Sequence, residues 1–144
     1  MKRFHYSLQK ILDLRHFQLK QAEMDLGKVN AQIAAVENKL KDIAAQRVRI
    51  AHEVDAAKDD MFLYQSAHSY FQLLNQKKES LLSTLAELQL VAEQKKAVVR
   101  AAMQREKVLD RLKDNKLASW KEAGRKEEEL IVDDVVTAKY NKAQ

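Results

Sequence analysis

A sustained heptad pattern of apolar residues constrains the fold of this chain more than any other feature. From Leu19 to Met61, positions alternately three and four residues apart are apolar, with Arg47 as the one charged exception. The pattern spans six heptads, and three or four heptads already indicate a coiled coil. We therefore predict a long helix whose apolar seam packs against a second helix. The seam positions between these ends are Ala22, Leu26, Val29, Ile33, Val36, Leu40, Ile43, Arg47, Ile50, Val54 and Ala57.

A less regular apolar repeat follows in the second half of the chain. It keeps one register and then shifts to another before Trp120, and such a shift predicts a local change in supercoiling. The chain has no proline and only two glycines, so the sequence offers little support for turns or strands inside either repeat. The first register comprises Leu81, Leu85, Leu88, Ala92, Lys95, Val99 and Ala102, and the second comprises Leu109, Leu112, Leu117 and Trp120.

An aromatic-rich segment between the two repeats indicates where the chain reverses. Residues 62–71 contain four of the eight Phe and Tyr residues. Ser69, with a glutamine three residues later, has the capping-box pattern of a new helix, and Ser66 is a second candidate N-cap. A reversal here places Leu8 opposite the region of Trp120.

Together these features predict an all-α fold, a long two-helix antiparallel coiled-coil hairpin with a C-terminal overhang. We expect a single coiled-coil domain over residues 1–144, with a first helix at about 5–60 and a second helix at about 70–140. The turn and the aromatic segment fall between them at about 61–69.

The distribution of charge favours an acidic protein surface as partner. The formal net charge is +5. Residues 1–20 hold five basic residues and one acid, and residues 93–121 hold nine basic residues and four acids, whereas residues 122–134 hold six acids and two bases. A chain that folds back brings the two basic stretches together. This density of basic residues is low for a helix that must neutralise many phosphates, so we expect no nucleic acid as partner.

No pattern in the sequence predicts catalytic residues, a metal site or a cofactor. The four histidines are never three or four residues apart, and the chain has no cysteine, no glycine-rich phosphate loop and no HExxH pattern. The acids between Glu127 and Asp134 are interpreted as a solvated helix face. Charged residues interrupt the N-terminal apolar clusters, so we expect neither a signal peptide nor a membrane segment. The sequence predicts a soluble cytoplasmic protein that is not an enzyme.

Arg47 and the aromatic residues of 62–71 each allow both a structural and a partner-binding interpretation. Arg47 at a seam position either sets the register, with its stem lying beside Val48, or contacts a partner. The rings of residues 62–71 exceed what a two-helix interface can bury. Some of them are therefore expected to be exposed and available as anchors for a partner.

Both ends of the chain resemble a known family. The segment FHYSLQKILDLR, from Phe4 to Arg15, has an aromatic pair before a run of leucines with glutamine and aspartate. The segment LDRLKDNKLASWKEAGRKEEELIVDDVVTAKY, from Leu109 to Tyr140, has a lysine-rich helix, a triplet of glutamates and an Asp-Asp pair. These motifs are similar to the two ends of the flagellar export protein FliJ family, and the resemblance spans nearly the whole chain.

The resemblance implies a soluble component of the flagellar type III export apparatus, located in the cytoplasm at the flagellar base. It implies a hairpin similar to the central stalk of rotary ATPases, whose ends enter the hexameric export ATPase and whose middle meets the export gate protein or export chaperones. Association with the membrane complex is then through protein contacts only. The candidate ATPase-binding residues are Lys10, Leu14, Arg15, Lys113, Lys116, Lys121 and Arg125. The candidate gate or chaperone-binding residues are Tyr64, Tyr70, Phe71 and Leu74.

Two other functions share the predicted architecture. The equivalent stalk protein of a virulence type III secretion system would have the same hairpin, and the terminal motifs favour the flagellar member. A generic coiled-coil scaffold would pair between molecules and have no ATPase partner.

Overall fold

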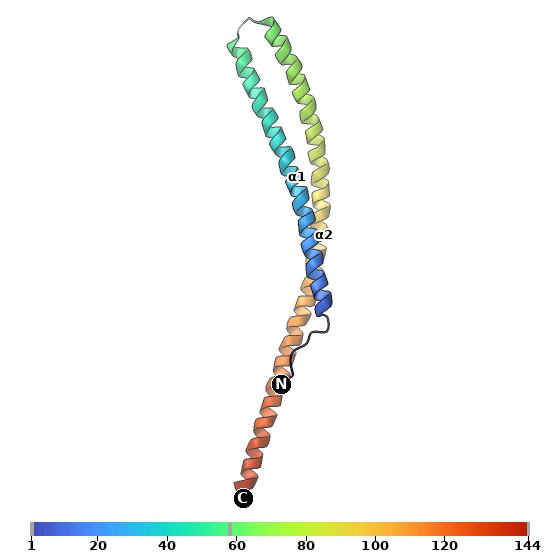
Figure 1. The fold of residues 1–144 in the computed structure, drawn as a ribbon, viewed down its shortest axis with the longest axis vertical. Coiled ribbons are helices and arrows are strands. Elements are labelled where there is room, and N and C mark those ends of the chain that lie inside the picture. Colours follow the sequence, from blue (N-terminus) through green and yellow to red (C-terminus); the bar gives the residue numbers. More distant parts are fainter. Residues whose placement is uncertain (1, 58, 144) are drawn as a thin grey trace. The chain divides into compact units, whose positions relative to one another are not determined.

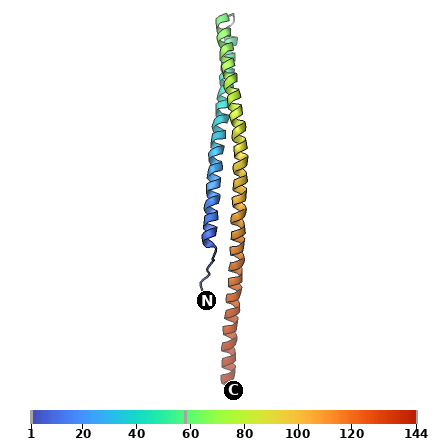
Figure 2. The ribbon, with the colours of Figure 1, turned by 90° about the vertical axis from the view of Figure 1, so that its right-hand side faces the viewer.

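The computed structural model describes residues 2–57 and 59–143 and contains two helices, α1 (Gln9–Ala56) and α2 (Met61–Ala143). The two helices pack against each other as an antiparallel hairpin, and the described residues include no strand, which confirms the predicted all-α class (Figures 1 and 2). The chain divides into two compact units. The terminal unit comprises Met1–Lys20 and Ala101–Gln144, and the loop unit comprises Gln21–Arg100.

The core of the loop unit is the predicted apolar seam. On α1, buried residues recur every seventh position, and the seam residues between them are half-buried. On α2, Leu74 is 1% exposed and is one of the two most deeply buried large side chains. The α1 seam prediction is therefore confirmed from its start to Val54. The buried residues of this unit are Ala22, Val29, Val36, Ile43, Ala67, Leu74 and Ala92.

Arg47, the charged exception in the seam, lies against an aromatic ring of the opposite helix. Its guanidinium carbon is 5.9 Å from the centroid of the Phe71 ring. An arginine at this distance is attracted by the negative face of the ring, and its stem covers apolar surface. This contact supports the structural interpretation of Arg47.

The reversal between α1 and α2 comes earlier than the sequence analysis predicted. Asp60 caps α2, because its carboxylate oxygen Oδ1 accepts a hydrogen bond of 3.1 Å from the backbone N–H of Leu63. Asp59 has a φ of 72°, a left-handed conformation that aspartate tolerates better than most residues. Helix α2 thus begins at Met61, so the predicted caps Ser66 and Ser69 were wrong.

The earlier turn changes the environment of the aromatic segment. Residues 61–69, predicted as a turn, form the first turns of α2 instead. Met61, predicted as the last seam residue of the first helix, lies beyond the end of α1 and is 71% exposed. The sequence carried the true signal in the two consecutive aspartates before an apolar run, a common helix-start pattern.

In the terminal unit, the residues before α1 are not helical. Residues 2–6 form an extended segment that lies along α2 (Figure 1). The hydroxyl of Tyr6 donates a hydrogen bond of 3.0 Å to the backbone oxygen of Leu109. The indole Nε1–H of Trp120 donates one of 3.1 Å to the backbone oxygen of Lys2. The first helix therefore begins at Gln9 rather than at about residue 5.

The earlier turn and the non-helical start of the chain together explain why the pairing at this end differs from the prediction. Each residue advances about 3.3 Å in an extended chain and about 1.5 Å in a helix. The four steps from Tyr6 to Lys2 therefore cover about 13 Å, close to the roughly 16 Å that separate Leu109 and Trp120 along α2. As a result Lys2, and not the predicted Leu8, contacts Trp120.

The predicted shift of register on α2 falls within the terminal unit. Apart from Asp110, the half-buried positions follow spacings of three, four, four and three residues from Glu106 onward. Two consecutive intervals of four residues turn the stem of Lys113 toward the helix interface. Leu112, which was predicted in the seam, is 37% exposed. The half-buried residues at these positions are Glu106, Leu109, Lys113, Leu117 and Trp120.

Gly27 allows a direct test of how far the helix propensity of one residue affects the free energy of unfolding. It lies in α1 outside the seam, and a Cβ built on it meets no atom within 4 Å. We expect Gly27→Ala to raise the free energy of unfolding by about 1 kcal/mol, measured by urea denaturation followed by circular dichroism at the helix band. Ala31→Gly, one turn later on an exposed position, is the matched control and should lower it by a similar amount. An unchanged midpoint in both variants would contradict this account.

Candidate functional site

An aromatic pair holds the start of the chain on α2 in the terminal unit. The ring centroids of Phe4 and Trp120 are 5.8 Å apart with planes inclined at 59°, a tilted arrangement that aromatic pairs favour. Tyr6 is 6% exposed. Together with the hydrogen bonds described above, these contacts form what we call the N-terminal latch, defined by Phe4, Tyr6 and Trp120. Sequence reasoning missed it because a helix was expected to begin before Tyr6.

Two of the predicted ATPase-binding lysines line one hollow beside this latch. Lys10 of α1 and Lys113 of α2 both border a hollow of about 700 Å³, together with residues of the extended segment. Lys10 is exposed and Lys113 is half-buried. Leu14 on the next turn of α1 is 50% exposed. The fold thus brings together basic residues that are more than 100 positions apart in the sequence.

The remaining candidates of this group differ in their surroundings. Arg15 is half-buried and donates a hydrogen bond of 2.9 Å from Nη1 to Gln18. Lys116 and Lys121 are exposed on α2. The structure therefore gives Lys116 and Lys121 the accessibility that a partner contact requires.

Arg125 forms ion pairs along its own helix. Its guanidinium contacts Glu122 at 2.7 Å and also pairs with Glu129. The hydrogen bond and the charge of Arg125 lower the pKa of Glu122, and the same two interactions with Glu122 raise the pKa of Arg125. All three side chains are more than half exposed, where such pairs contribute little to stability. The positive charge of Arg125 is nevertheless offset locally by these acids.

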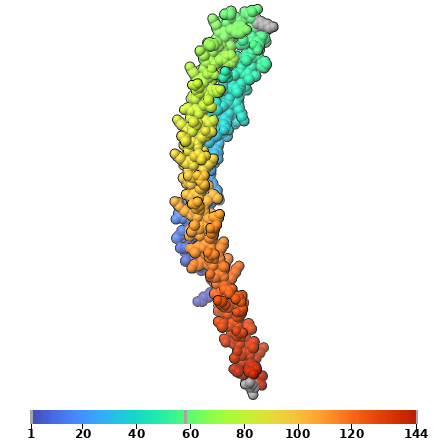
Figure 3. Space-filling view, turned by 180° about the vertical axis from the view of Figure 1, so that it is seen from behind, coloured from blue at the N-terminus to red at the C-terminus, as the bar shows by residue number. Residues whose placement is uncertain are grey.

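Beyond Gly124, α2 has no covering segment in the terminal unit. Every described residue from 125 to 143 is exposed (Figure 3), in agreement with the predicted C-terminal overhang. The exposed side chains include large apolar ones such as Leu130 at 64% and Ile131 at 57%. This stretch of α2 exposes both acidic and apolar side chains.

The predicted gate or chaperone-binding residues fall into two groups in the loop unit. Tyr64 is 44% exposed and Tyr70 is 39% exposed. Phe71 is half-buried beneath Arg47, and Leu74 is 1% exposed. Leu74 therefore belongs to the helix interface and has no surface to offer a partner, whereas the two tyrosines do.

Tyr70 also borders a hollow between the two helices. Its hydroxyl donates a hydrogen bond of 3.2 Å to Gln46 Oε1. The hollow, of about 560 Å³, is lined from both helices close to the loop, including Ile50 and Leu63. Phe62, which is 79% exposed, lines a second hollow together with Tyr70. Aromatic and apolar side chains near hollows are the usual anchors of protein interfaces.

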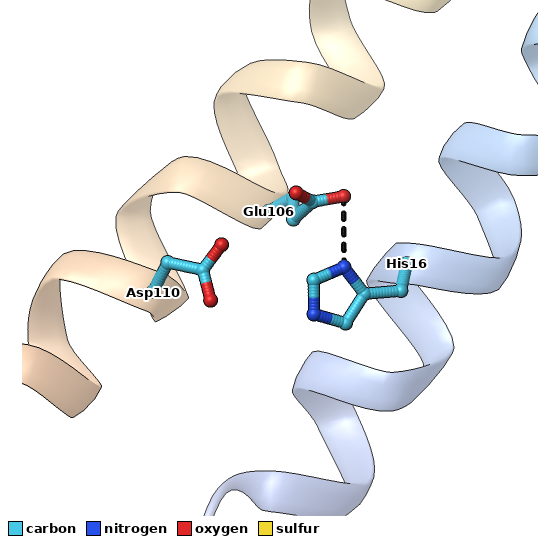
Figure 4. A group of neighbouring side chains, drawn as sticks. All are labelled: His16, Glu106 and Asp110. Atoms are coloured by element: carbon cyan, nitrogen blue, oxygen red, sulfur yellow. Dashed lines mark ion pairs between the residues drawn. The ribbon is translucent and has the colours of Figure 1, made fainter.

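A cross-helix cluster in the terminal unit was not foreseen from the sequence. His16 of α1 lies 3.0 Å from Glu106 of α2, measured from Nδ1 to Oε2. Potential ligand atoms of His16, Glu106 and Asp110 all lie within 4.8 Å of one another (Figure 4). The two acids are four residues apart and so share a helix face, a spacing that can be read from the sequence. Their histidine, however, comes from the other helix.

The polar side chains of the described chain lie at or near its surface. Residues 2–57 and 59–143 bury no polar or charged side chain. No helix in the described ranges is long and apolar enough to cross a membrane. The fold thus defines an all-helical hairpin protein.

Comparison with family models identifies the kind of hairpin. Residues 4–144 match the model described as Flagellar FliJ protein, and the chain belongs to this family. It is therefore a non-catalytic component of the flagellar export apparatus, and the family suggests the cytoplasmic side of the flagellar base. Comparisons with curated proteins and with solved structures give no match. The family match favours the flagellar system over a virulence secretion system.

Trp120 is the one tryptophan of the chain and reports on the N-terminal latch. We expect Phe4→Ala to shift the tryptophan emission to longer wavelength, because removal of the Phe4 ring exposes the indole to water. Phe17→Ala, which truncates a side chain that is 60% exposed on α1, is the control and should leave the emission unchanged. Identical spectra for the wild type and Phe4→Ala would show that the latch does not form in solution.

Proposed function

We propose that the terminal unit binds the hexameric flagellar export ATPase as a central-stalk-like hairpin, and that the loop unit contacts the export gate protein and export chaperones. Membership of the FliJ family supports the export apparatus as the setting. The surfaces described above support the proposed assignment of each partner to a unit.

The basic character of the terminal unit is the observation that carries the first part of this proposal. Residues 1–20 hold five basic residues and one acid, and they share this unit with the lysine-rich part of α2. Lys10 and Lys113 border one hollow, and Lys116 is exposed on the same helix as Lys113. An acidic surface lining the ATPase ring would complement this basic surface.

Exposed lysines suit a contact that must change during the ATPase cycle. Salt and water screen such pairs, so each contributes only about 0.2–1 kcal/mol. Several weak contacts hold the hairpin in the ring without fixing it in a single orientation. The N-terminal latch supports this role because it orders the start of the chain beside α2.

The exposed aromatic side chains of the loop unit carry the second part. Tyr64 and Tyr70 are accessible in the first turns of α2, and Phe62 and Leu73 add apolar surface at 79% and 44% exposure. Tyrosine and phenylalanine supply large contact areas with few torsions to restrict, which suits reversible binding of successive partners.

Charge reversal tests the ATPase contact. We expect the triple variant Lys10→Glu, Lys116→Glu, Lys121→Glu to bind the ATPase at least about tenfold more weakly, because three attractive contacts become repulsive. Stimulation of ATP hydrolysis and ring assembly should fall in parallel. Both are measured with the purified ATPase at near-physiological salt. Lys113 is left intact because its half-buried stem contributes to helix packing.

A matched variant separates position from charge. Lys41→Glu, Lys77→Glu, Lys78→Glu makes the same change of net charge at exposed positions of the loop unit, and it should retain normal stimulation. Equal loss in the two triple variants would mean that overall charge, and not the terminal unit, governs binding. Full stimulation by the first variant would remove the ATPase contact from this surface.

Truncation of exposed tyrosines tests the second contact. We expect Tyr64→Ala with Tyr70→Ala to weaken binding to the gate protein or to export chaperones by about tenfold or more, as for interface aromatic anchors. Binding is measured by calorimetry with each purified partner, and ATPase stimulation should be retained. Phe17→Ala with Tyr140→Ala removes two exposed rings of the terminal unit and is the control. Unchanged affinity for every partner would place their contacts elsewhere.

A further inference from the structure

We propose that His16, Glu106 and Asp110 form a Zn²⁺ site that joins α1 to α2 in the terminal unit. The inference rests on the geometry of this cluster and does not depend on the proposed partners. Figure 4 shows the imidazole of His16 and the two carboxylates pointing toward one another across the space between the helices.

The distances suit one small divalent ion after modest side-chain adjustment. The potential ligand atoms lie within 4.8 Å of one another, and His16 Nδ1 lies 3.0 Å from Glu106 Oε2. Zinc binds nitrogen and carboxylate oxygen at about 2.0–2.2 Å, which sets neighbouring tetrahedral ligands roughly 3.3 Å apart. A pair of ligand atoms at the 4.8 Å limit therefore has to approach by about 1.5 Å, and a closer pair by less. Rotation of the half-buried Asp110 side chain or of the exposed His16 ring would bring the ligand atoms closer.

The position of Glu106 indicates a need for a positive partner. It occupies a seam position between Ala102 and Leu109, and its side chain is only 20% exposed. An acid at an apolar helix interface is partly deprived of water, which disfavours an uncompensated charge. Within the described residues, the ion-pair partner of Glu106 is His16, which is charged only when protonated.

Asp110 increases this need. It lies four residues after Glu106 on the same face of α2, and two like charges at this spacing repel each other. Residues 2–57 and 59–143 provide no lysine or arginine in an ion pair with either acid. A divalent cation between the two carboxylates neutralises both, and the imidazole nitrogen completes a three-ligand set from two helices.

The ligand types select the ion. One imidazole and two carboxylates suit zinc and related first-row ions, whereas magnesium and calcium prefer sites made of oxygen alone. Three protein ligands leave the fourth tetrahedral position to water. Because the ligands come from both helices, the ion binds the paired state and stabilises the terminal unit.

Titration of the full-length chain with ZnCl₂ tests the site. We expect one Zn²⁺ per chain by isothermal titration calorimetry, and a melting temperature raised by about 5 °C or more when zinc exceeds its dissociation constant a hundredfold. His16→Ala and Asp110→Asn should each weaken binding by about tenfold or more and, at the same zinc concentration, reduce the thermal shift by about half or more. Circular dichroism without zinc checks that each variant keeps its helix content.

Two control variants identify the ligands. Asp114→Asn makes the same substitution one turn further along α2 at an exposed position, and His52→Ala removes an exposed histidine of the loop unit. Both should bind zinc like the wild type. Wild-type affinity in His16→Ala and Asp110→Asn, equal losses in the control variants, or no stoichiometric binding at all would each overturn the proposal.

Discussion

The apolar seam between α1 and α2 is the interaction on which the rest of the structure depends. A single long helix gains little stability from its backbone alone, so packing along one face has to supply it. In the loop unit this packing comes from small residues such as Ala22, Ala67 and Ala92, with Leu74 the most deeply buried side chain. A two-helix interface has no second layer. The faces away from the seam therefore remain available to partners, and function in this chain has to be a property of surfaces.

The ends of the hairpin solve a different physical problem. A heptad seam alone does not anchor the first residues of a chain, which tend to fray. Here residues 2–6 leave the helical path and use extended backbone to reach further along α2, where Tyr6 and Trp120 fix them by hydrogen bonds to the opposite backbone. The consequence is an ordered surface in the terminal unit that combines N-terminal residues with the lysine-rich part of α2. If the terminal unit binds the export ATPase as proposed, this order reduces the conformational entropy lost on binding.

Features of this structure that depend on residues close together in the sequence were predicted, whereas contacts between distant residues were not. The α1 seam up to Val54 was predicted residue by residue, because heptad spacing is a local property of one helix. The turn was misplaced because several polar residues offered cap patterns, and Ser66 and Ser69 were preferred to Asp60, which caps α2. That error shifted the predicted pairing of the two helices. The approach of His16 to Glu106 and Asp110 depends on the register between the helices, which no single segment encodes.

The charged residues in the seam specify the register between the helices more strictly than the apolar residues do. Leucine and valine pack acceptably in many registers, whereas a charged side chain at the interface requires one particular neighbour. Arg47 finds the ring of Phe71 in the loop unit, and Glu106 finds His16 in the terminal unit. A slip by one heptad would separate Arg47 from the Phe71 ring and Glu106 from His16. Arg47 and Glu106 thus favour one register between the two helices. In the terminal unit, that register also brings together the ligands proposed for zinc.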